Sequence, residues 1–263
     1  MTIFKNLYLY RELLKSNIKK ELRGKYKGSF LGILWSFINP LLTTLVYAIV
    51  FPYLLRGAQI PNYLIYLIVC IIPWNFFTVV ISQGGQCIRN EAGIIKKVYF
   101  PREILPICVT ISGLVNFFIS CVIIVAFLIG SGVGLSKYIL LVPVVALVQA
   151  LFSLGLVFII SSVNVYIKDL EYIVNFIVQM LFYGTPILYG IETIAGASAP
   201  SLIVTLVKLN PMTTIMNSYR NLMYYQQMFD VVPMLMVAIL SIVLVVVGYM
   251  IFKKLEKGFA EEL

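Results

Sequence analysis

The chain has 263 residues, of which 61% are apolar and 12% are charged. Soluble domains carry about 25% charged residues, and a chain of this size has too little interior to bury so much apolar surface. The composition therefore excludes an ordinary soluble domain and predicts an integral membrane protein. The formal net charge of +9 does not indicate nucleic-acid binding, because the basic residues stand in short blocks between apolar runs.

The first 27 residues form a basic segment without a long apolar core. Apolar residues recur in it at spacings of three and four, which places them on one face of a helix. They are Ile3, Leu7, Tyr10, Leu14, Ile18 and Leu22. We predict that residues 1–27 form an amphipathic helix along the cytoplasmic membrane interface, with its basic side chains near anionic head groups. A helix packed only on protein is the alternative.

Six largely uncharged runs follow, each about as long as a membrane-spanning helix needs to be. They predict spans at about residues 31–55, 62–86, 105–130, 138–165, 172–190 and 232–252. Backbone amides in lipid must pair within their own segment, so we expect an all-α membrane protein, with residues 28–263 as one six-span domain. Sixteen of the 20 Lys and Arg residues fall on one side of these spans. This bias predicts that both termini are cytoplasmic.

Two connections have predicted structure of their own. The loop between the second and third spans is short, charged and bounded by Pro101, and it predicts a cytoplasmic helix over about residues 89–100. Such a helix could carry movement from a soluble partner to two spans, although a plain connecting turn is an alternative. The apolar pieces within about residues 193–229 are too short to span, which predicts re-entrant outer helices between the fifth and sixth spans.

Catalytic chemistry is absent from the sequence. It contains no histidine and no phosphate-binding loop, nucleophile elbow or zinc-protease motif. The four cysteines have no metal-ligand spacing, so we expect no catalytic residue, metal or cofactor in this chain. The spans carry no acidic or basic residue, which argues against an ion-coupled carrier. A glycan-modifying membrane enzyme would need grouped acidic or histidine side chains, whereas a passive channel would need no helix for coupling to a partner.

Aromatic residues in the spans are candidates to line a pore, because flat ring faces can stack on sugar rings that slide past. The candidates are Trp35, Phe37, Tyr47, Phe176, Phe182 and Tyr183. Neutral polar residues on the spans could hydrogen-bond sugar hydroxyl groups; they include Asn39, Thr43, Thr44, Ser82, Gln83, Gln149, Asn164, Asn175 and Gln179. The alternatives are interfacial belts or lipid packing for the rings, and helix–helix contacts for the polar residues.

Five segments, in order along the chain, resemble permeases of ABC polysaccharide exporters, which carry O-antigen, capsule or teichoic acid chains. The segments are RGKYKGSFLGILWSFINPL at 23–41, IIKKVYFPR at 94–102, KDLE at 168–171, GTPILY at 184–189 and NPM at 210–212. The resemblance covers essentially the whole chain and is closest to the O-antigen and teichoic-acid branches.

The resemblance implies a homodimer that binds two copies of a separate ATPase subunit, with ATP and Mg²⁺ held by that partner. It implies the inner membrane of a bacterium, surrounding lipids, no nucleic acid, and a polysaccharide linked to a polyprenyl diphosphate lipid. The loop candidates for ATPase coupling are Glu91, Ile94, Lys96, Lys97 and Tyr99. The candidates for diphosphate contact are Arg23, Lys25 and Lys27, which membrane topology alone also explains.

The sequence thus predicts the transmembrane subunit of an ATP-driven exporter that moves a lipid-linked polysaccharide out of the cytoplasm. An ABC exporter of drugs or lipids with the same six-span plan is the alternative.

Overall fold

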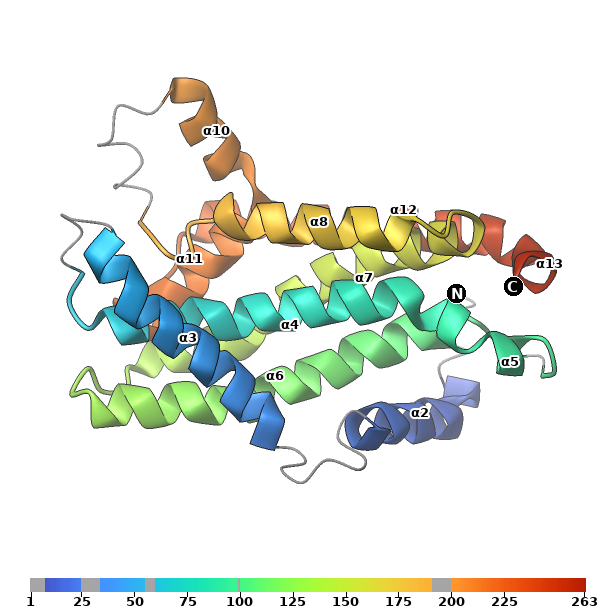
Figure 1. The fold of residues 1–263 in the computed structure, drawn as a ribbon, viewed down its shortest axis with the longest axis horizontal. Helices are drawn as coiled ribbons and strands as arrows, with labels where there is room; N and C mark the ends of the chain where they lie inside the picture. Colours follow the sequence, from blue (N-terminus) through green and yellow to red (C-terminus); the bar gives the residue numbers. More distant parts are fainter. Residues whose placement is uncertain (1–7, 25–33, 55–59, 99, 191–199) are drawn as a thin grey trace.

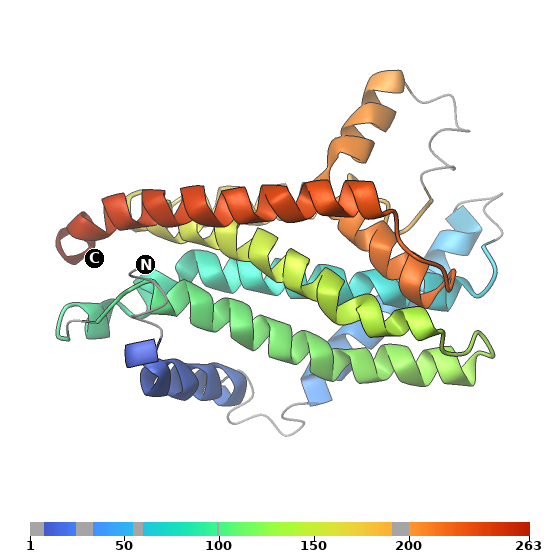
Figure 2. The ribbon, with the colours of Figure 1, turned by 180° about the vertical axis from the view of Figure 1, so that it is seen from behind.

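The computed structural model describes residues 8–24, 34–54, 60–98, 100–190 and 200–263. Within these ranges every regular element is a helix, in agreement with the predicted all-α class. The long helices run side by side along the longest axis of the molecule (Figures 1 and 2). The helices α2, α5 and α13 gather at one end of this bundle (Figure 1), which we call the basic end, and α11 lies toward the far end.

Four helices are long and apolar enough to cross a membrane. Their cores are α4 (Tyr63–Asn90), α6 (Ile104–Gly130), α7 (Val142–Tyr166) and α12 (Val231–Leu255), and a 3₁₀ turn at Lys137–Leu141 leads into α7. The 25 residues of α12 extend over about 38 Å, more than the hydrocarbon thickness of about 30 Å. These helices establish an integral membrane protein.

Two further apolar helices are shorter. α3 (Trp35–Leu54) has 20 residues, and α8 (Leu170–Tyr183) has 14. α8 is only about 21 Å long, so the helix expected over residues 172–190 ends earlier than predicted. Its stop has a local cause, since Gly184 follows directly and the residue before Pro186 is disfavoured in helix. The count of six spans stays a prediction.

The amphipathic helix predicted near the N-terminus appears as α2 (Arg11–Gly24). It packs against α6, and the apolar side chains of Tyr10, Leu13 and Leu14 join a buried cluster there. The Cys108 thiol lies 3.7 Å from the Leu14 carbonyl oxygen, to which it donates. Packing on protein is therefore part of its environment, while its place at the membrane interface stays a prediction. Ile3 and Leu7 of the predicted stripe lie outside the described residues.

Two buried carboxamides of the core donate to backbone carbonyl oxygens. Gln149 Nε2 donates to the Pro73 carbonyl oxygen at 2.8 Å, and Asn164 Nδ2 donates to Gly85 O at 2.8 Å. α7 and α12 approach closely at Gly155 and Gly248, because a Cβ on Gly248 would lie 2.5 Å from the Gly155 carbonyl oxygen. Asn164 and Gln149, which could have faced a pore, are instead helix-packing residues.

The stretch after α8 contains two short helices, α10 (Ser201–Leu209) and α11 (Pro211–Met223). α11 packs against the bundle, whereas α10 stands away from it (Figures 1 and 2). Asn210 separates them: its Oδ1 accepts from Met212 N at 3.0 Å and caps α11, and its Nδ2 donates to Thr185 Oγ1 at 2.9 Å. Both helices are too short to span, as the sequence predicts.

Candidate functional site

A cavity of about 450 Å³ opens between α3, α4 and α8, and we call it the groove. On each helix the lining residues, some of them adjacent pairs, recur at intervals of three or four, so they share one helix face. The wall consists of Asn39, Pro40, Thr43, Tyr47, Ile71, Trp74, Asn75, Thr78, Asn175, Val178, Gln179, Phe182 and Tyr183. The groove thus combines aromatic rings with neutral polar side chains.

The aromatic part of the wall is continuous across the three helices. Phe182 stacks on Tyr47, with ring centroids 5.8 Å apart and planes at 30°. It also contacts Trp74 at 5.8 Å and Tyr183 at 5.3 Å, both edge to face. Such pairs hold rings in fixed positions. Phe182 is the ring at the centre of this patch.

The polar part of the wall carries carboxamide and hydroxyl groups. Asn75, Asn175 and Gln179 each offer both donors and acceptors. Ser82 Oγ, on α4, donates to Asn175 Oδ1 at 2.5 Å and so orients that amide. One helical turn closer to the basic end, Gln86 Nε2 donates to Glu171 Oε1 at 2.6 Å. A surface of this kind can hydrogen-bond hydroxyl groups and stack on the apolar faces of a sugar.

Three of the six predicted pore candidates, Tyr47, Phe182 and Tyr183, lie on the groove wall. Phe176 lies elsewhere on α8 and is 60% exposed, and Trp35, at the start of α3, is not part of the wall. The side chain of Phe37 lies outside the described residues. What these rings do in transport stays a prediction.

Trp74 was not among the six pore candidates, although it lines the groove and contacts Phe182. On α3, the spacing of polar and aromatic residues in the sequence indicates which helix face lines the groove. Asn39, Thr43 and Tyr47 follow one another at intervals of four, which identifies one polar and aromatic face of α3. α4 carries a similar signal, because Asn75, Thr78, Ser82 and Gln86 follow one another at intervals of three and four, and Trp74 stands four residues before Thr78 beside that face.

At the basic end, α4 connects to α6 through the single turn α5 (Ala92–Ile95). The helix expected over residues 89–100 is therefore shorter than predicted, since Arg89 and Asn90 still belong to α4. Gly93 weakens the turn, and Pro101 disfavours helix in the residue before it. A short turn of this kind is closer to the connecting-turn alternative than to a long helix.

The predicted coupling residues lie around this turn. Glu91 accepts from Lys20 Nζ at 2.6 Å, which joins the connection to α2. Ile94 is 46% exposed, and Lys96 and Lys97 are exposed beside it. Together they form a charged surface with an apolar residue at its centre. Tyr99 lies outside the described residues.

The predicted diphosphate contacts cannot be placed, because Lys25, Lys27 and the side chain of Arg23 also lie outside the described residues.

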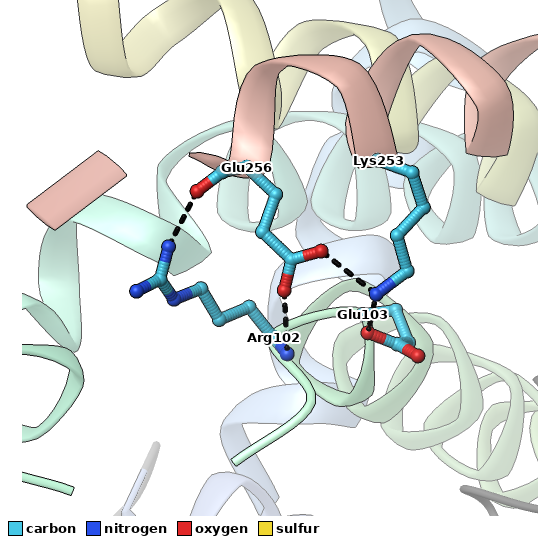
Figure 3. Close-up of polar contacts among 4 residues, drawn as sticks. All are labelled: Arg102, Glu103, Lys253 and Glu256. Carbon is cyan, nitrogen blue, oxygen red and sulfur yellow. Dashed lines mark hydrogen bonds and ion pairs between the residues drawn. The ribbon is translucent and has the colours of Figure 1, made fainter. Parts of the chain in front are cut away.

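Four charged residues at the basic end form a cluster that the sequence reasoning missed, which we call the clasp (Figure 3). Lys253 Nζ, near the end of α12, lies 2.7 Å from both Glu103 Oε2 and Glu256 Oε2. Arg102 Nη1 donates to the Glu256 carbonyl oxygen at 2.5 Å. The Glu103 side chain is fully buried. The clasp joins the start of α6, directly after the connection that contains α5, to the end of α12.

Arg220 has a comparable role at the far end. Although it is charged, it is only 3% exposed, and its Nη2 donates to Pro186 O at 2.7 Å and to Ile187 O at 3.1 Å. Its Nη1 donates to Asn217 Oδ1 at 3.2 Å, and its guanidinium carbon lies 3.9 Å from the centroid of the Tyr66 ring. These contacts hold the segment after α8 against α4 and α11. The sequence indicated only that Arg220 was one of the few basic residues on the outer side.

Further hydrogen bonds join the loops at the far end. The Tyr63 hydroxyl donates to Leu188 O at 2.7 Å, and the Tyr224 hydroxyl donates to Pro61 O at 2.5 Å. The far end is thus fastened by hydrogen bonds, whereas the basic end presents charges.

Most of the chain matches the sequence model of one protein family. The model of ABC-2 type transporters matches residues 12–224, from α2 past the end of α11. The chain belongs to the ABC-2 type transporter family. The matched range includes the three helices of the groove and the connection between α4 and α6.

Relatives of this ABC-2 chain extend the match to nearly its full length. It is 36% identical over 261 residues to an O-antigen export system permease protein RfbA from Myxococcus xanthus, covering 99% of both chains. Two proteins of the same name from Klebsiella pneumoniae are 34% and 33% identical, and each alignment covers 97% of this chain and 95% of the relative.

Proposed function

We propose that this chain is the transmembrane subunit of an ATP-driven exporter that moves a polyprenyl-diphosphate-linked polysaccharide from the cytoplasm across a bacterial inner membrane. The observation that carries the proposal is the groove, in which Tyr47, Trp74 and Phe182 provide ring faces beside neutral hydrogen-bonding groups. The near full-length similarity to O-antigen export permeases supports it independently.

The proposed assembly contains two copies of this chain and two copies of a separate ATPase. The missing phosphate-binding loop supports a separate ATP-hydrolysing partner, which binds the ATP and Mg²⁺. The exposed Ile94, Lys96 and Lys97 beside α2 supply its docking surface. A second copy of this chain would face the groove and complete a channel.

The proposed topology has six spans, with α3 and α8 as the first and fifth. Because α8 is short, α10 and α11 form the outer part of the membrane domain by dipping back into it. The basic end faces the cytoplasm, since most Lys and Arg residues lie on that side.

Reconstitution tests the function. The chain and its ATPase partner would be placed in proteoliposomes, and ATP hydrolysis would be measured with polyprenyl-diphosphate-linked glycan and, separately, with small amphiphiles. We expect the glycan to stimulate hydrolysis. Stimulation by small amphiphiles and not by any lipid-linked glycan would instead identify an exporter of drugs or lipids.

A further inference from the structure

We infer that the groove selects polysaccharides with uncharged repeat units and disfavours polymers with a carboxylate or phosphate in each repeat. This inference rests on the proposed function and narrows its substrate class. It starts from the groove wall, whose polar side-chain groups are uncharged: carboxamides and hydroxyls, such as those of Asn75, Thr78 and Gln179, and the indole N–H of Trp74.

The absence of charge extends beyond the wall itself. Residues 28–55, 57–88 and 172–191, which contain the groove-lining segments, include no Asp, Glu, Lys or Arg, and the chain has no His. A second copy of this chain would bring the same uncharged segments to the opposite side. No residue of these segments can therefore supply a cation to the polymer.

An anionic repeat unit binds unfavourably in this uncharged groove. Transfer of a carboxylate or phosphate from water into a membrane-embedded groove is costly unless a cation pairs with it. Carboxamides can donate hydrogen bonds to an anion, but they cannot neutralise it. The hydroxyl groups of a neutral sugar need only hydrogen bonds, and its apolar faces can stack on Phe182 and Trp74.

Glu171 adds a second, independent observation. It lies one helical turn from Asn175, toward the basic end of the same helix, and Gln86 Nε2 holds its carboxylate at 2.6 Å. Within α8 itself Glu171 is the charged residue, and its carboxylate repels an anionic repeat unit that passes beside it. A single diphosphate anchor would cross once per chain, whereas a charged repeat would meet Glu171 at every step.

Two lipid-linked polymers of equal length test the inference in proteoliposomes that contain the chain with its ATPase. One is a neutral hexose polymer, and the other carries a hexuronic acid in every repeat. We expect the neutral polymer to stimulate ATP hydrolysis at least tenfold more than the acidic one. Equal or greater stimulation by the acidic polymer overturns the inference but leaves the proposed function standing. Stimulation by neither polymer rejects the proposed function, and the inference with it.

A matched pair of variants separates charge from shape. Gln179 is an exposed residue of the groove wall, so a longer side chain fits there. Gln179→Lys places a cation in the groove, and Gln179→Met is a neutral control of similar length. We expect Gln179→Lys to raise stimulation by the acidic polymer, relative to the neutral one, at least fivefold over Gln179→Met. The same ratio in both variants would count against charge selection.

Discussion

Phe182 is the residue on which the groove depends most, because it contacts Tyr47, Trp74 and Tyr183. Phe182→Ala removes the ring that the other three contact. We expect glycan export to fall about tenfold, because the loss of stacking on the sugar and of contacts among the remaining rings raises the activation free energy of transport by about 1.4 kcal/mol. Phe182→Tyr keeps the ring and should retain most activity. Phe176→Ala, on the same helix but outside the groove, is the matched control. Equal losses in the two alanine variants would contradict a specific role for the groove.

Arg220 is a stabilising residue at the far end. Arg220→Met removes three hydrogen bonds, of which two are to the carbonyl oxygens of Pro186 and Ile187. We expect the free energy of unfolding to fall by about 2 kcal/mol and the melting temperature in detergent by about 4–8 °C. Lys208→Met, at an exposed position on α10, should change neither. An unchanged melting temperature for Arg220→Met would refute this role.

Individual groove residues could be predicted from the sequence only where polar residues recur at helical spacing and so mark one helix face. Tyr47 and Phe182 could be chosen because they stand in segments with a recognisable polar face. Glu103 and Lys253 are 150 positions apart, and no local pattern indicates that they meet. Their contact depends on the packing of α6 against its neighbours, which a single sequence does not encode in any short motif.

At the scale of elements, the clasp ties α6 to α12. Lys253→Met leaves the fully buried Glu103 carboxylate without that cation, and we expect a loss of about 3 kcal/mol in the free energy of unfolding. The double variant Glu103→Gln with Lys253→Met should recover more than half of it, because no buried charge then remains at position 103. The exposed Lys254→Met is the control. Thermal unfolding in detergent gives the comparison, and a double variant as unstable as Lys253→Met would contradict the ion-pair explanation.

The turn around α5, which we propose as the docking surface for the ATPase, makes a separate prediction. Lys96→Glu with Lys97→Glu reverses two exposed charges beside α5 without touching the packed core. We expect co-purification with the ATPase to fall strongly while the melting temperature of the isolated chain stays the same. Lys168→Glu, another exposed charge at the basic end, is the control. Unchanged complex assembly and export would rule out docking at Lys96 and Lys97.

The observed helix boundaries agree with the predicted ones where the apolar runs are long, as in α6 and α12. They differ from the predicted ones where an uncharged run continues past the end of a helix. The run through residues 172–190 is uncharged throughout, yet the helix ends at Tyr183 because Gly184 and Pro186 follow and Arg220 binds the carbonyl oxygens of Pro186 and Ile187. Hydropathy measures the solvent that a segment prefers and is insensitive to such a stop.

At the scale of the whole molecule, the proposed topology places the basic end in the cytoplasm. In a background without the four native cysteines, Lys254→Cys should react with an impermeant thiol reagent only from the cytoplasmic side, and Lys137→Cys only from the outer side. Both positions are exposed: Lys254 lies in the last turn of α12, and Lys137 begins the 3₁₀ turn that leads into α7. Labelling of both from the same side would contradict the topology.

The central claim is that the groove belongs to a pathway for a lipid-linked glycan driven by ATP. Its most direct test is ATP-dependent transport in proteoliposomes that contain the chain with its ATPase and a polyprenyl-diphosphate-linked neutral polymer. Protection of the glycan from an added glycosidase measures its transfer into the lumen. We predict protection that requires ATP and falls about tenfold with Phe182→Ala. Protection without ATP, or protection that Phe182→Ala leaves unchanged, would contradict the account.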